Sequence, residues 1–182
     1  IRAGAFRFLE IGKKQLLWEA HILLNGVKNQ QDNNLLFTTL LQKPVLPQLE
    51  SSFLEDLYDE IELFGFPITG TMFDLTKAAY IGDVSASNMA TYAGQIVRMV
   101  GDFVADKTVK TKKGTLMKFG TFLDAEGVFF DTVHFPPSLK AYPLYGNGVY
   151  LIMGKVVLDF GCPALEVHRC ARMPLKPDPR SE

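Results

Sequence analysis

Basic residues are concentrated between Arg98 and Lys118, at a spacing that suits contact with a phosphate backbone. This stretch holds Arg98, Lys107, Lys110, Lys112, Lys113 and Lys118, against only Asp102 and Asp106. Ammonium groups that share one loop attract the successive phosphates of a nucleic acid strand. The alternative is a solvated hairpin tip, since lysine also keeps strand edges soluble. Charge alone favours that alternative.

Aromatic rings supply the second requirement of a single-strand binder, because every base has a face that stacks. Phenylalanines follow the basic stretch, at Phe119, Phe122, Phe129, Phe130 and Phe135. Strand alternation puts Phe119 and Thr121 on one face and Phe122 on the other. We expect most of these rings to form core, with one or two left in a groove.

The candidate contacts follow from these two features. We assign phosphate contact to the basic group, namely Arg98, Lys107, Lys110, Lys112 and Lys113. Phe119 is the candidate for base stacking, with Thr121 beside it. The next strand contributes either Asp131 or Phe130, and the choice depends on a strand register that the sequence leaves open.

The whole-chain composition conceals this local charge. The 182 residues are 47% hydrophobic and carry a net charge of −1, which excludes a disordered chain and does not by itself suggest nucleic acid. Residues 45–75 contain no Lys or Arg but seven acidic residues, so an acidic segment offsets the basic one. Cys162 and Cys170 are too few for a disulfide scaffold. The missing initiator Met indicates a piece of a longer protein, which we expect to be cytoplasmic.

Catalytic patterns do not emerge from the sequence. The three histidines are far apart, and we expect each to be structural or on the surface. Cys162, His168 and Cys170 lack the spacing and the fourth ligand of a zinc site. Glu55, Asp59 and Glu62 are expected on the solvent face of an acidic helix. We therefore predict no catalytic residue, no metal and no cofactor in this chain.

Helical texture marks the first part of the chain. Residues 1–24 have helix formers and an apolar stripe, with Gly12 between two helical pieces. Residues 25–34 have the composition of a linker. Residues 51–64 predict a second helix, capped by Ser51 or Ser52 and ended by Gly65.

Strand signals begin near residue 92, where the apolar period changes to two. Five strands are expected: a long one around 97–103, then 117–123, 128–135, 149–158 and 165–172, with a helical piece after Pro136. That order is typical of an OB-fold β-barrel in an α+β chain. The alternatives are another five-stranded barrel and a small sandwich. The expected divisions are 1–24, a linker and helical connector over 25–90, the barrel over 91–173 and an extended tail over 174–182.

Short motifs occur along the chain in a consistent order: RAGAF at 2–6, ELFGFPITG at 62–70, TKKG at 111–114, MKFGTFLD at 117–124, DTVHFP at 131–136 and YLIMGKV at 150–156. Together they resemble the C-terminal region of bacterial DNA polymerase III alpha subunits, including error-prone alpha-like polymerases. The resemblance implies that residues 1–24 end a helix-hairpin-helix region and that an OB-fold follows. Departures occur at Thr71, Asp102 and Leu123, which suggests a divergent branch.

The resemblance also implies a function. The parent would be a DNA-directed DNA polymerase, a nucleotidyltransferase that uses Mg²⁺ in replication or repair synthesis, with its catalytic carboxylates outside this chain. This part would bind single-stranded template DNA. The family carries a sliding-clamp peptide at the place of Asn33, Leu36 and Phe37, and those residues could instead form a polar linker packed on helix 51–64. An interaction module that docks the clamp or another replisome subunit is the alternative function, and a synthetase anticodon-binding domain explains less of the chain.

Overall fold

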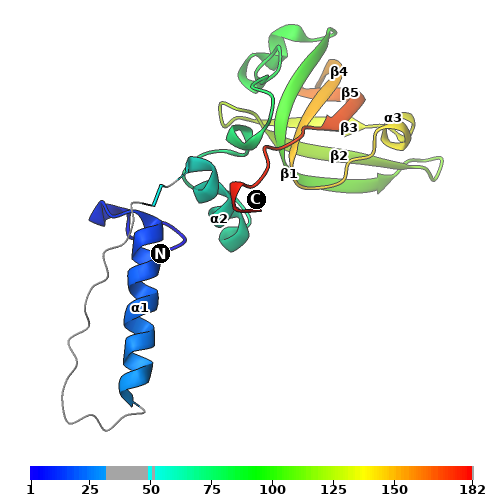
Figure 1. Ribbon diagram of the computed structural model, residues 1–182. Coiled ribbons are helices and arrows are strands. Elements are labelled where there is room, and N and C mark those ends of the chain that lie inside the picture. Colours follow the sequence, from blue (N-terminus) through cyan, green and yellow to red (C-terminus); the bar gives the residue numbers. More distant parts are fainter. Residues whose placement is uncertain (32–48, 51, 182) are drawn as a thin grey trace. The chain divides into compact units, whose positions relative to one another are not determined.

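Two compact units make up the computed structural model, which describes residues 1–31, 49, 50 and 52–181 (Figure 1). One unit combines Ile1–Thr69 with Pro177–Glu182, and the other is Gly70–Lys176. No helix in the described ranges has the length and apolar content needed to cross a membrane. The predicted clamp residues Asn33, Leu36 and Phe37 lie outside the described residues.

A closed five-stranded barrel forms the larger unit. Its elements are β1 (Ile96–Lys110), β2 (Leu116–Leu123), β3 (Phe129–His134), α3 (Pro136–Ala141), β4 (Val149–Asp159) and β5 (Cys162–Arg172). The strands close in the order β1-β2-β3-β5-β4, with β3 and β5 parallel and the other pairs antiparallel. This order, with a helix between the third and fourth strands, is that of the OB-fold. The predicted fold is confirmed.

Strand β1 serves both sides of the barrel because it bends. Its first half pairs with β4 and its second half with β2, and the register shifts between Phe103 and Ala105. Gly101 lies where a Cβ would meet the Phe130 ring at 2.7 Å and the Cβ of Phe122 at 2.8 Å. A glycine therefore lets β1 pass close over the core at the turn from one partner strand to the other.

Stacked aromatic rings fill the centre of the barrel. Phe122 stacks on Phe130 with ring centroids 5.7 Å apart, and Tyr150 and Phe103 meet Phe122 edge to face. His134 is also fully buried, which lowers its pKa to about 4. That histidine is structural, as expected.

Residues before the first strand complete this core. The 3-10 helices η2 (Met72–Leu75) and η3 (Ala86–Tyr92) belong to the barrel unit, and Met89 is fully buried in its core cluster. The buried carboxylate of Asp124 accepts hydrogen bonds from the backbone N–H groups of Ala86, Glu126 and Val128. One aspartate thus joins η3 to the β2–β3 turn.

The smaller unit contains α1 (Lys13–Gln31) and α2 (Phe53–Phe64), with short 3-10 helices η1 (Arg7–Leu9) and η4 (Pro179–Ser181). Helix α2 begins after Ser52, which occupies the N-cap position without a side-chain capping hydrogen bond. It ends at Gly65, whose φ of 85° is left-handed, as the sequence predicts. Helix α1 continues to Gln31, so the prediction of a linker from residue 25 is wrong over 25–31. The helix continues through Gly26 and the polar residues after it, because polar composition and a single glycine lower helix propensity without ending a helix.

The carboxylates of α2 are not all on a solvent face. Asp59 is 5% exposed and accepts hydrogen bonds from Arg2 at 2.7 Å, Lys13 at 2.5 Å and Arg180 at 2.6 Å. The expectation of a solvated Asp59 is therefore wrong, because three cations distant in sequence converge on it. Buried charges persist where such partners compensate them.

Glu60 is the second buried acid of α2, with 1% exposure. It accepts hydrogen bonds from the hydroxyl and the backbone N–H of Thr69, from the backbone N–H of Ile68 and from Arg7. Burial opposes ionisation, but these hydrogen bonds outweigh it and lower the pKa of Glu60 to about 2. The acidic segment thus holds its own unit together.

We predict that Gly154→Ala destabilises the barrel. A Cβ at this position on β4 would clash with the carbonyl oxygen of Glu166 on β5, which is backbone and cannot rotate away. Overpacking of this kind costs about 1–3 kcal/mol, and thermal unfolding followed by circular dichroism measures it. Gly12→Ala is the control, because a Cβ there meets nothing within 4 Å. Equal melting temperatures for the two variants would contradict this account of β4–β5 packing.

Candidate nucleic-acid interface

The hairpin of β1 and β2 extends past the end of the barrel (Figure 1). Its tip is closed by hydrogen bonds from Thr111 N to Thr115 O and from Gly114 N to Thr111 O, at 2.8 and 2.9 Å. Gly114 has a φ of 78°, a left-handed conformation that favours glycine. The turn therefore holds Lys112 and Lys113 at the outermost point of a regular two-stranded ribbon.

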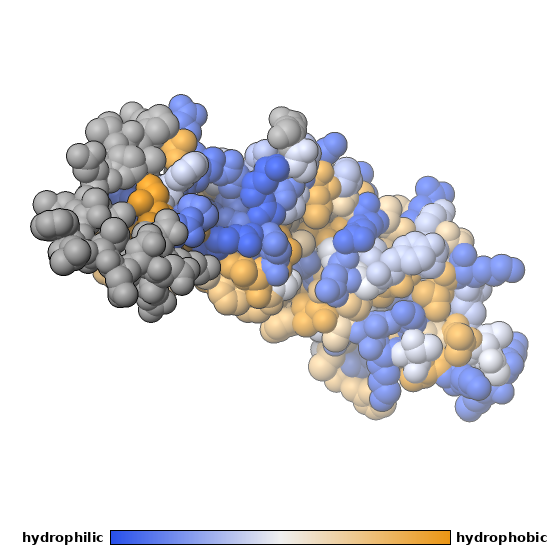
Figure 2. All heavy atoms as spheres, turned by 60° about the horizontal axis from the view of Figure 1, so that its bottom comes forward, coloured by the Kyte–Doolittle hydropathy of each residue, from blue (hydrophilic) through white to orange (hydrophobic). Residues whose placement is uncertain are grey.

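Four of the predicted phosphate contacts share this hairpin. Lys107, Lys110, Lys112 and Lys113 are all exposed, and none is ion-paired with a carboxylate in the part of the chain that the structure describes. Lys107 lies directly opposite Phe119, so the two share a face. Lys110 is three residues further on, which places it on the other face of the ribbon. Hydrophilic side chains gather at this end of the barrel unit, beside hydrophobic surface (Figure 2).

Arg98 does not belong to this group. It lies in the half of β1 that pairs with β4, where it forms a salt bridge with Asp83 at 2.8 Å and stands over the Tyr80 ring. Its charge is therefore satisfied locally, away from the hairpin tip. Lys118 is likewise paired, with Asp106 across the ribbon.

The register of β2 and β3 decides which residues face outward. Thr121 pairs with Asp131, and its hydroxyl donates a hydrogen bond to Asp131 Oδ1 at 2.7 Å. Phe130 alternates to the inside and is 4% exposed. Of the two candidates on this strand, Asp131 lies on the outer face. The prediction of Phe130 as a base contact is wrong, because its ring is buried in the core and has no free face for a base.

More rings remain on the surface than the sequence led us to expect. Phe119, Phe129 and Phe135 are 43%, 63% and 40% exposed, whereas Phe122 and Phe130 are core. The expectation that most of the five would be core is wrong, because Tyr150 and Phe103 supply the remaining aromatic packing from other strands. Phe160, at the β4–β5 turn, is fully exposed as well.

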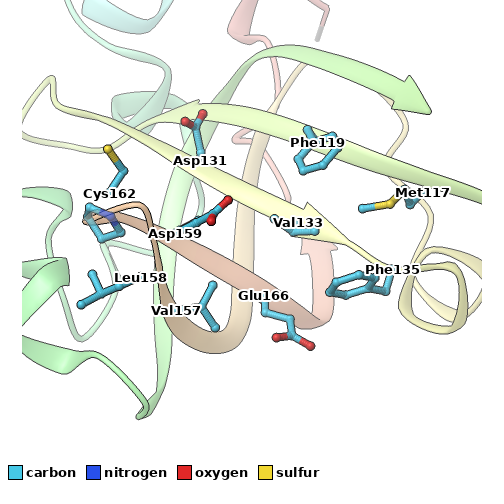
Figure 3. Close-up of a pocket in the computed structure, with 12 residues that line it drawn as sticks. Met117, Phe119, Asp131, Val133, Phe135, Val157, Leu158, Asp159, Cys162 and Glu166 are labelled. Carbon is cyan, nitrogen blue, oxygen red and sulfur yellow. The ribbon is translucent and has the colours of Figure 1, made fainter. Parts of the chain in front are cut away.

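A groove of about 640 Å³ lies on the outer face beside Phe119. Figure 3 shows its lining from β2, β3, the β4–β5 hairpin and β5. Its apolar part includes Phe119, Val133, Phe135 and Leu158. Sequence reasoning missed the wall formed by the β4–β5 hairpin. The available signal was Phe160-Gly161 between two strands, a turn that leaves an aromatic ring with no core position.

Three carboxylates also line the groove, those of Asp131, Asp159 and Glu166. Lys155 lies directly opposite Glu166 on β4. In the described ranges, no group of three or more His, Cys, Asp and Glu side chains is arranged to hold a metal ion. Cations thus concentrate on the hairpin, and the groove beside it contains acids and apolar side chains.

Comparisons with known proteins find only distant similarity to solved structures. No family model matches the sequence, and no curated protein matches it. Wild-type single-stranded DNA binding protein from Thermus aquaticus aligns at 20% identity and a TM-score of 0.39 over 45% of this chain and 41% of that chain. A putative nucleic acid-binding lipoprotein from Klebsiella pneumoniae aligns at 20% identity and 0.36 over 49% and 78%.

The second OB-fold domain of replication protein A from Methanococcus maripaludis aligns at 13% identity and a TM-score of 0.32, over 47% of this chain and 90% of that domain. The aligned region is less than half the length of the Thermus aquaticus protein. At these values the comparisons assign no function, and the fold assignment here rests on strand order and pairing.

We predict that the native protein has one reactive thiol. Cys162 is exposed on the groove wall, whereas burial of Cys170 raises the pKa of its thiol to about 12. A disulfide reagent such as Ellman's should therefore modify Cys162 quickly and Cys170 only after unfolding. Cys162→Ser should abolish the fast reaction and Cys170→Ala should leave it intact. Rapid reaction of Cys170 in the native protein would contradict the described burial.

Proposed function

We propose that the barrel binds single-stranded DNA across the outer face of β2 and β3. The observation that carries this proposal is one continuous surface. Exposed Lys107 lies opposite the exposed ring of Phe119 on one face of the hairpin, and exposed Lys112 and Lys113 lie at its tip, none of the three with a carboxylate partner in the described structure. Lysines follow a phosphate backbone, and an open ring stacks a base. No residue of this surface is assigned a catalytic role.

A single strand suits the surface better than a duplex. Phe119 can stack only on a base that has left its own stack, and the groove beside it, of about 640 Å³, has the volume to receive one. The groove has no cationic side chain in its lining, so the phosphates are assigned to the hairpin lysines outside it. The bases then face the groove and the backbone follows Lys107 towards the tip.

The finer part of the proposal concerns the parent protein. We propose a DNA polymerase III alpha-like chain, with this surface holding template during replication or repair synthesis. Its support is the consistent order of the six short motifs along the chain, from RAGAF at 2–6 to YLIMGKV at 150–156. Two of their glycines also meet demands of the fold, Gly154 at a close approach and Gly114 at the left-handed turn. The Mg²⁺ and catalytic carboxylates of such a parent would lie elsewhere in it.

The test is fluorescence anisotropy of a labelled oligonucleotide over a salt series. We expect the logarithm of affinity to fall linearly with the logarithm of salt, by about 0.7 for each phosphate contacted. Replacing Lys107, Lys112 and Lys113 by Ala should therefore reduce the slope by about 2. Phe119→Ala should cost about 1–3 kcal/mol of binding free energy at every salt concentration.

Matched variants separate specific from general effects. Lys140→Ala removes an exposed cation of α3, outside the proposed surface, and should leave the slope nearly unchanged. Bound DNA should also protect Cys162 from the thiol reagent, because that residue lines the groove. Absence of binding at low salt, or binding that the lysine variant does not affect, would reject the proposal.

A second candidate function rests on sequence alone. Asn33-Asn34-Leu35-Leu36-Phe37 is similar to a sliding-clamp peptide, with Leu36 and Phe37 as apolar anchors. We propose that this segment binds a clamp. The double variant Leu36→Ala with Phe37→Ala should abolish capture on immobilised clamp and leave DNA binding unchanged. Clamp capture that persists in the double variant would exclude this segment.

A further inference from the structure

The side chains that line the groove beside Phe119 offer a ligand hydrogen-bond acceptors and almost no donors. Its polar side chains are Asp131, Asp159, Glu166 and the thiol of Cys162, and the rest of its lining is apolar. An ionised carboxylate has only acceptors, and a thiol is a weak donor. A ligand edge that enters this groove must therefore bring its own donors, since an acceptor placed there would face carboxylate oxygens.

Asp131 is the acceptor best placed for a base. It is the diagonal cross-strand neighbour of Phe119, and such neighbours lie about 7–8 Å apart, within reach of a ring stacked on the aromatic side chain. The adjacent positions in its own row are small, namely Thr121 on β2 and Ala164 on β5. Asp131 thus has a small neighbour on each side of it across the sheet.

One of the two carboxylate oxygens of Asp131 already accepts a hydrogen bond within the protein. The hydroxyl of Thr121 donates a hydrogen bond to Oδ1 at 2.7 Å, which orients the carboxylate. Oδ2 accepts no hydrogen bond among the described residues and is free to accept one from a ligand. Asp159 lies towards the same end of the groove as Asp131 (Figure 3), so two acceptors gather there, away from Phe135.

We propose that this groove selects bases whose pairing edge carries an amino group, and disfavours thymine. Cytosine, adenine and guanine present an exocyclic amine that donates to a carboxylate, as Asp and Glu do when they read the cytosine amine in a DNA groove. Thymine presents carbonyl oxygens on both sides of its single N–H donor, and those oxygens would face Asp131 and Asp159. This inference rests on the proposed single-strand binding and deepens it to a base preference.

The experiment compares oligo-dC with oligo-dT of equal length, at neutral pH or above and at one salt concentration. Both are pyrimidines with the same backbone, so phosphate contacts cancel in the ratio of their affinities. We expect oligo-dC to bind at least about fivefold more tightly, from the discrimination that a good base-edge contact provides. Equal affinities would overturn the base preference and leave single-strand binding standing. Failure of both to bind would instead reject the proposed function.

Variants locate the preference. Asp131→Asn and Asp159→Asn keep the side-chain shape but add an amide donor, so oligo-dT should gain affinity and the ratio should approach one. Glu126→Gln is the control, because Glu126 lies in the β2–β3 turn, hydrogen-bonded to Ser87, and does not line the groove. A preference that survives the Asn double variant would overturn the assignment to these carboxylates.

A second measurement leaves the protein unchanged. An oligonucleotide of N4,N4-dimethylcytosine has no amino protons to donate, so it should lose the advantage of oligo-dC on the wild-type chain. Retention of tight binding by the dimethylated strand would show that the amine is not read, and would overturn the inference whatever the behaviour of the variants.

Discussion

The stack of Phe122 on Phe130 is the interaction on which the proposed surface depends. These residues pair across β2 and β3, and their rings lie 5.7 Å apart inside the barrel. A strand has a side-chain period of two, so a slip of one residue would turn every side chain to the opposite face. With the two rings inside, Phe119 and Asp131 must be outside. The stack therefore fixes the groove as well as the core.

The two units use their charged residues differently, and the net charge of the chain does not show this. In the smaller unit, buried Asp59 and Glu60 are compensated by cations and backbone N–H groups from the same unit. In the barrel, the hairpin lysines have no such partners among the described residues, and the groove carboxylates lie apart from them. A net charge of −1 conveys nothing about this separation, because it sums over units that use their charges differently.

The elements were largely predictable, and their exceptions have physical causes. Alternation predicted four of the five strands to within a few residues, and Pro136 marked the start of α3. Strand β1 continues to Lys110, seven residues beyond its predicted end and into the predicted basic loop. Helix α1 exceeded its predicted end because polar residues cap or continue a helix according to context. The prediction that Asp59 is solvated was wrong because the spacing of polar residues shows which face of a helix is polar. It does not show which side chains from other segments contact that face. Those partners, Arg2 and Arg180, lie at opposite ends of the chain.

The sequence by itself determined the barrel class, the basic hairpin and the set of rings available for stacking, because these follow from local periodicity and turn chemistry. Tertiary structure placed Asp131 outside and Phe130 in the core, paired Arg98 with Asp83 away from the hairpin tip and added the β4–β5 hairpin as a groove wall. Each of these depends on a contact between residues distant in sequence. Cross-strand register and barrel closure determine such contacts, and neither can be predicted from the local periodicity of one segment.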